Sequence, residues 1–84
     1  MEKEKAIVIF EMVKSQRSAD LELPLDISAD ELVKALNTAY SLGIDTENPR
    51  NCYLQAENPF VLLKGNKALK DFGIRNGTLI RFTE

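Results

Sequence analysis

The 84-residue sequence predicts an α+β fold in which one helix packs across one face of a mixed sheet. Two observations lead to this prediction. Strand-like segments flank a single amphipathic helical segment, in the order strand, strand, helix, strand, short strand, strand. The helix and the first two strands each have an apolar face, and one shared core buries both. The length fits one small domain over residues 1–84, with a loose N-terminus at 1–5.

The first two strands are expected to form a hairpin. Ala6–Val13 is rich in β-branched and aromatic residues, which favour strands, and Lys14–Ser18 is polar and turn-like. In Leu21–Leu25 leucine alternates with glutamate or proline, the pattern of a half-buried strand. Pro24 has no N–H for a neighbouring strand, so we expect it near the end of this strand or at an unpaired edge position.

The helix is predicted from Ala29 to about Leu42. Ser28 and Glu31 have the spacing of a capping box, in which each side chain hydrogen-bonds the backbone N–H of the other residue. Gly43 is well placed to end the helix. Helical spacing predicts one apolar stripe, made of Leu32, Ala35, Leu36, Ala39 and Tyr40.

The second half of the chain supplies the remaining strands. After a loop at Ile44–Asn51, the predicted segments are a strand at Cys52–Glu57, a turn at Asn58–Pro59, a short strand at Phe60–Leu63, a helical turn within Leu69–Ile74, a tight turn at Asn76–Gly77 and a last strand at Thr78–Phe82. Placing the last strand beside the first, and parallel to it, gives the sheet order 2-1-5-3-4. This arrangement is the β-grasp.

Two stretches carry a resemblance to known families. Leu69–Gly77 (LKDFGIRNG) is similar to "Leu-Ser-Asp-x-Gly-Ile-x-Asn-Gly" of the YukD/EsaB family, small bacterial ubiquitin-like proteins encoded with Gram-positive type VII secretion systems. The longer Pro59–Phe82 resembles ubiquitin's short strand, glycine turn, "Leu-x-Asp-Tyr-x-Ile" and last strand. The resemblance implies a ubiquitin-like β-grasp fold. It also implies an accessory or regulatory role in secretion, through contacts with the membrane-associated machinery, either the ATPase or its membrane partners.

The resemblance further implies that the protein is not conjugated to targets. Ubiquitin-type conjugation needs a flexible C-terminal Gly-Gly. The sequence contains no Gly-Gly pair and the chain ends Arg81–Glu84, so we expect no conjugation. Two alternatives stay open: a ubiquitin-like modifier or sulfur carrier, and a ubiquitin-like domain excised from a larger membrane component.

Composition argues against catalysis and against cofactors. The sequence has no histidine, which removes the usual base near neutral pH, and one cysteine, which cannot form a four-ligand Cys/His metal site. Cys52 lacks an evident base to activate it, and a lone cysteine suits a reducing compartment. We therefore expect no enzymatic activity, no cofactor and no metal.

Several local motifs have simpler explanations. Asp71–Gly73 spells a kinase magnesium motif without the rest of a kinase, and Asn76–Thr78 is a glycosylation acceptor in a sequence without a secretion signal. Asp26, Asp30 and Glu31 lack the spacing of a calcium loop.

Charge and hydropathy bear on partners and location. The net charge is −2 with scattered basic residues, so we expect no nucleic-acid partner. No apolar run approaches the ~20 residues that span a bilayer, so we expect a cytoplasmic protein without direct membrane insertion.

A protein-binding face is predicted from strand alternation. If Ala6, Val8, Phe10 and Met12 face the helix, Ile7 and Ile9 point away from it together with Glu11. In the last strand, Ile80 and Phe82 inward place Leu79 and Arg81 outward. The predicted face therefore consists of Ile7, Ile9, Leu79 and Arg81. Such a patch marks a contact surface, although exposed apolar residues are also normal in central strands, and a homodimer formed through this face would satisfy the same pattern.

Overall fold

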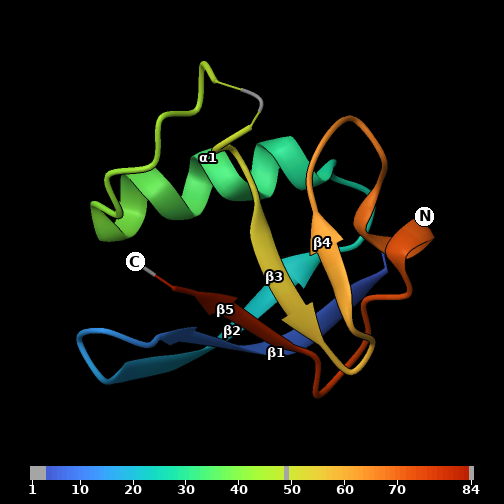
Figure 1. Ribbon diagram of the computed structural model, residues 1–84. Coiled ribbons are helices and arrows are strands. Elements are labelled where there is room, and N and C mark those ends of the chain that lie inside the picture. Colours follow the sequence, from blue (N-terminus) through green and yellow to red (C-terminus); the bar gives the residue numbers. More distant parts are fainter. Residues whose placement is uncertain (1–3, 49, 84) are drawn as a thin grey trace.

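The computed structural model describes residues 4–48 and 50–83. These residues form five strands, one α-helix and one 3₁₀ helix, and Figure 1 shows how the strands and the α-helix are arranged. The elements are β1 (Lys5–Met12), β2 (Arg17–Pro24), α1 (Ala29–Tyr40), β3 (Leu54–Glu57), β4 (Val61–Leu63), η1 (Leu69–Phe72) and β5 (Leu79–Phe82). Of the expected loose N-terminus, residues 1–3 lie outside the described residues, and Lys5 is the first residue of β1.

The sheet has the order β2-β1-β5-β3-β4, which confirms the predicted β-grasp topology. β1 pairs with β2 antiparallel and with β5 parallel, and β3 pairs antiparallel with both β5 and β4. The helix α1 lies across one face of this twisted sheet, and none of the described elements covers the opposite face (Figure 1). Pro24 is the last residue of the edge strand β2, where its missing N–H costs no ladder bond.

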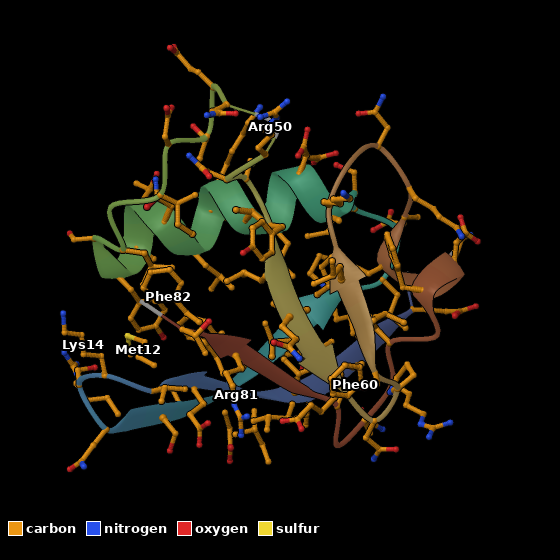
Figure 2. All side chains as sticks on the ribbon, viewed as in Figure 1. Met12, Lys14, Arg50, Phe60, Arg81 and Phe82 are labelled. Carbon is orange, nitrogen blue, oxygen red and sulfur yellow. The ribbon has the colours of Figure 1, made fainter. Side chains whose placement is uncertain are left out.

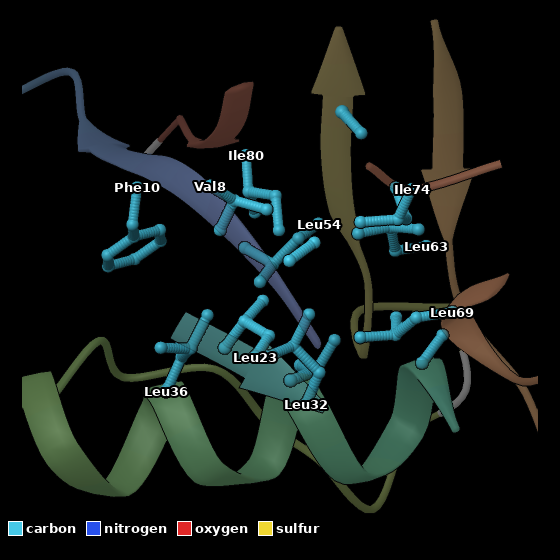
Figure 3. Close-up of a cluster of buried hydrophobic side chains, with 14 of the residues drawn as sticks. Val8, Phe10, Leu23, Leu32, Leu36, Leu54, Leu63, Leu69, Ile74 and Ile80 are labelled. Atoms are coloured by element: carbon cyan, nitrogen blue, oxygen red, sulfur yellow. The ribbon is translucent and has the colours of Figure 1, made fainter. Parts of the chain in front are cut away.

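The core lies between α1 and the sheet. Figure 3 shows Phe10 and Ile80 of the sheet on one side of the core and Leu32 and Leu36 of the helix on the other. Every second residue of β1 is buried against the helix, as predicted: Ala6, Val8, Phe10 and Met12. Ile80 is also fully buried, and Phe82 is partly buried against the core. The pleat of β1 and β5 therefore separates a core side from an open side.

The start of α1 is as predicted, but its end is not. The capping box is present: the Ser28 hydroxyl accepts from the Glu31 N–H, and the Glu31 carboxylate accepts from the Ser28 N–H. The helix ends at Tyr40, two residues early, with Ser41 as its left-handed C-cap. Gly43, the predicted end, also has a positive φ of +77° but lies beyond the cap. The Asn37 side chain explains the early end, because its amide donates to the Ile44 carbonyl and accepts from the Ile44 N–H, which turns the chain back onto the helix.

The predicted apolar stripe of the helix was rotated from the observed one. Ala35 and Ala39 are exposed, and Val33 is buried instead, so the core-facing residues are Ala29, Leu32, Val33 and Leu36. A branched Val33 removes more apolar surface from water than an alanine does, which favours this rotation. Tyr40 of the predicted stripe does reach the core, with its ring 5.1 Å from that of Phe10.

The strand ends follow backbone pairing rather than apolar pattern. β2 begins at Arg17, four residues before the predicted start, because the hairpin register pairs Arg17 with Met12 at the end of β1. β3, β4 and β5 start slightly later than predicted. The backbone N–H of Cys52 bonds within the preceding loop to Asn48, and that of Thr78 bonds to Arg75, so neither N–H donates to a neighbouring strand.

Thr78 joins two turns at one end of the sheet. Its side chain is fully buried, and its hydroxyl donates to the Asn58 carbonyl at 2.9 Å and accepts from the Arg75 N–H at 3.1 Å. The Arg75 guanidinium also donates to the Asn58 side chain at 2.9 Å. The turn before β4 is therefore held against the turn before β5.

Thr78→Val keeps the size and branching of the side chain but leaves the Asn58 carbonyl and the Arg75 N–H without their hydroxyl partner. We expect the free energy of unfolding, measured by urea denaturation, to fall by about 1–3 kcal/mol. Thr38→Val, on the exposed side of α1, is the matched control and should change it by less than about 0.5 kcal/mol. Equal losses in the two variants would contradict this role of the hydroxyl.

Candidate protein-binding face

The open side of the sheet carries the apolar side chains that the sequence predicted to point outward. Ile7 is 53% exposed and Ile9 is 40% exposed, while their neighbours in β1 are buried. Leu79 of β5 lies beside Ile9 in the parallel register and is partly exposed. These three residues, which we call the β1–β5 apolar patch, form a continuous surface on one side of two adjacent strands.

Ile7 lies next to the turn that leads into β5. Its backbone N–H donates to the Asn76 side chain at 2.7 Å, and its carbonyl accepts from the Gly77 N–H at 2.9 Å. Gly77 has φ +89°, a conformation that glycine adopts without strain. The Asn76–Gly77 turn thus holds the end of the apolar patch in place through the backbone, leaving the Ile7 side chain exposed.

Arg81, the fourth predicted residue, is engaged within the face itself. Its guanidinium donates to Glu11 at 2.9 Å and lies 3.2 Å from a carboxylate oxygen of Glu57, and each of the three side chains is about one-third exposed. The side chain of Arg81 points away from the helix (Figure 2). The three residues form an ionic ridge across β1, β5 and β3. The sequence identified Arg81 and the outward direction of Glu11, but not their pairing or the part of Glu57.

A second apolar group on the open side was missed. Phe60 is 73% exposed and Leu62 is 50% exposed; Leu62 pairs with Gln55 of β3, which is the register partner of Arg81. Figure 2 shows Phe60 at the end of the sheet where β3 turns into β4. We call Phe60 and Leu62 the β4 apolar patch. The sequence gives no signal for this direction, because Phe60–Leu63 is apolar at every position; the burial of Leu63 in the structure shows that Leu62 points outward.

The cysteine has an environment that disfavours nucleophilic chemistry. Cys52 is buried, and its thiol donates to the Asp30 carboxylate at 3.5 Å. Burial raises the pKa of the Cys52 thiol, and the hydrogen bond and negative charge of Asp30 raise this pKa further. A raised pKa keeps the side chain in the thiol form, which is the poor nucleophile.

The described residues form neither a metal-binding cluster nor a membrane-spanning helix. Over residues 4–48 and 50–83, no three Cys, Asp or Glu side chains are grouped closely enough to hold a metal ion. No helix in the same residues has the length and apolar character needed to cross a bilayer.

Comparison with known proteins identifies one family. Residues 7–81 match the model of the family described as "WXG100 protein secretion system (Wss), protein YukD". The match covers both halves of the chain, well beyond the Leu69–Gly77 stretch that first suggested it. No curated protein matches the chain in sequence.

Solved structures of similar shape are ubiquitin-like domains. The C-terminal ubiquitin-like domain of mouse tubulin-specific chaperone e has a TM-score of 0.76 at 11% identity, covering 99% of this chain and 89% of that one. A ubiquitin-like domain from tubulin-binding cofactor B has a TM-score of 0.76 at 20% identity, covering 99% and 92%. The UBL domain of Plasmodium falciparum Dsk2 has a TM-score of 0.60 at 18% identity, covering 93% and 97%. At these identities, the likeness shows the ubiquitin-like β-grasp fold alone.

The ionic ridge predicts a specific pattern in a double-mutant cycle. Arg81→Gln should lower the free energy of unfolding by about 1 kcal/mol, because it leaves Glu11 and Glu57 as neighbouring like charges. Glu11→Gln should destabilise the wild-type protein but be neutral or stabilising in the Arg81→Gln background. Urea denaturation at low salt and at 1 M salt checks both points, since screening should shrink the coupling. A coupling of zero at low salt would show that the ridge is not formed in solution.

Proposed function

The chain belongs to the YukD family of the WXG100 protein secretion system, and from this premise we propose that it is a non-catalytic, protein-binding accessory component of a Gram-positive type VII secretion system. The proposal treats residues 1–84 as one ubiquitin-like domain. Its partners are proteins of the membrane-associated secretion machinery, either the ATPase or its membrane partners. It acts in the cytoplasm, and the single free Cys52 agrees with a reducing compartment there.

The proposal is supported mainly by exposed apolar residues that gather on the face of the sheet opposite α1. A sheet covered on one side normally presents polar residues on the other. Here Ile7 and Ile9 occupy two successive outward positions in β1, next to Leu79. A contiguous apolar patch on a small domain marks a contact surface. We therefore assign partner binding to Ile7, Ile9, Leu79 and Arg81, with Arg81 shaping the edge of the contact through its ion pairs.

The chemistry of the remaining residues supports a binding role over a catalytic one. The sequence has no histidine, and the thiol of Cys52 is buried and hydrogen-bonded to a carboxylate. The hydroxyl of Thr78 is also buried and is occupied by two backbone partners.

The binding face is tested by replacing two apolar residues with charged ones. Ile7→Glu/Leu79→Glu should reduce co-purification with the secretion ATPase and its membrane partners, from the native bacterium, by about tenfold or more, because burying two carboxylates in the contact is costly. Ala35→Glu/Ala39→Glu places the same charges on the exposed side of α1 and should have no effect.

Folding of each variant is checked by circular dichroism and thermal unfolding. If the double variant does not fold, Ile7→Glu alone, at the most exposed of the three apolar positions, gives the comparison. A folded variant that co-purifies as well as the wild type would rule out this face.

The absence of conjugation is a separate expectation. The sequence has no Gly-Gly pair of the kind that activating enzymes use, so the protein isolated from its native cells should have an intact mass without a covalent protein or sulfur adduct. An adduct at the C-terminal carboxylate would favour the modifier or sulfur-carrier alternative.

A further inference from the structure

The exposed apolar side chains of the open face are divided into two groups by the ionic ridge. The β1–β5 apolar patch lies on one side of the ridge, and the β4 apolar patch lies on the other. One row of outward residues runs across the strands from Ile9 to Leu79 to Glu57, as the pairing registers show. Val61 of β4 pairs with Ala56 of β3 in an antiparallel register. The next residue on each strand is therefore Phe60 opposite Glu57, so Phe60 continues this row.

The spacing of the two patches suits a helix lying across the strands. Neighbouring strands are about 4.8 Å apart, so β5 and β4, with β3 between them, are separated by roughly 10 Å. Residues seven apart in an α-helix are about 10.5 Å apart along its axis and lie on nearly the same side. Two apolar side chains spaced in this way can each reach one patch, with the helix crossing the ridge between them.

The charges of the face indicate the charge of the partner. Beside the β1–β5 apolar patch, the outward positions of β2 opposite Ile9 and Ile7 are Asp20 and Glu22. Glu22 is 3.5 Å from Lys5, in a pair whose side chains are both more than half exposed and which therefore contributes little. Among the described residues, Asp20 makes no ion pair.

Carboxylates outnumber cations on this side of the sheet. The acidic residues are Glu11, Asp20, Glu22 and Glu57, against Lys5 and Arg81. Arg81 is already held between two carboxylates, so it is not free to meet a second copy of the face. Two copies placed face to face would bring like charges together, which disfavours the symmetric homodimer. A partner with cations at the margins of its apolar surface would instead be attracted.

We propose that the open face binds an amphipathic α-helix of a different protein, which lies across the strands. Apolar residues two turns apart in this helix contact the β1–β5 and β4 patches. Its basic residues lie opposite Asp20, Glu22 and Glu57. The inference rests on the proposed function, because it gives the chemistry of the partner at the same face. It extends that function to Phe60 and Leu62, which the binding assignment above does not include.

The test uses two synthetic helical peptides as probes. Both have leucines seven residues apart and a lactam bridge on the opposite side; one has arginines flanking the leucines, and the other has glutamates. Titrated into the ¹⁵N-labelled protein, the arginine peptide should shift amide resonances in β1, β5 and β4 and bind about tenfold tighter than the glutamate peptide. Equal affinities, or shifts confined to α1, would overturn the proposal.

Charge variants identify the carboxylates responsible. Asp20→Lys/Glu22→Lys should remove most of the preference for the arginine peptide. The matched control Glu47→Lys/Asp71→Lys makes the same change of net charge outside the sheet and should preserve the preference. Phe60→Ser, at the most exposed apolar position, should lower the affinity for the arginine peptide about fivefold without unfolding the protein. Unchanged binding in the Asp20/Glu22 or Phe60 variant would overturn the proposal.

The test also separates this inference from the proposed function. If light scattering shows a dimer of the free protein that Ile7→Glu dissociates, the face is used by a second copy and the inference fails. If the peptide preference is found but Ile7→Glu/Leu79→Glu leaves co-purification with the secretion machinery intact, the inference holds and the assigned function fails. If Ile7→Glu/Leu79→Glu abolishes co-purification but neither peptide is preferred, the proposed function holds and the inference of a basic helical partner is wrong.

Discussion

The parallel pairing of β1 with β5 is the constraint on which the rest of the structure depends. It joins the two ends of the described chain, and together with the pairing of β5 with β3 it makes one sheet out of the β1–β2 hairpin and the β3–β4 pair. Its backbone bonds include those from Ile9 to Thr78 and from Val13 to Phe82. Because a parallel pair cannot be closed by a tight turn, the helix and the intervening strands must form the connection. The layer of α1 over the sheet follows from this topology.

The same pairing decides what the open face contains. Glu11 and Arg81 are 70 positions apart in the sequence, yet their side chains meet at 2.9 Å because both strands present them outward at one level of the sheet. β3 then brings Glu57 to the other side of the guanidinium. The face therefore combines apolar patches with an ionic ridge. In the binding mode that we propose, the patches provide contact area and the ridge restricts how a partner can lie on the face. Area alone is a poor guide to affinity, and such polar features supply orientation and specificity.

The fold and the family membership give different information about the function of this protein. Ubiquitin-like domains of low identity share this architecture, and a fold by itself does not specify activity. Membership of the YukD family gives the secretion context. The distribution of exposed apolar and acidic residues, which belongs to this chain, gives the proposed mode of binding. Each of these three levels therefore answers a separate question about the protein.

The sequence by itself determined the order of the elements, the capping box at Ser28 and the alternation of β1, because these depend on neighbours only a few residues away. From them the strand order and the outward direction of Ile7, Ile9, Leu79 and Arg81 could be predicted. Only the tertiary structure decided the rotation of α1, the end of that helix and the partners of Arg81. The rotation of α1 and the partners of Arg81 depend on residues far apart in the chain that meet once the sheet has formed. The end of α1 depends on hydrogen bonds between Asn37 and Ile44, which lie within one local segment, but hydrophobic periodicity does not report such side-chain bonds.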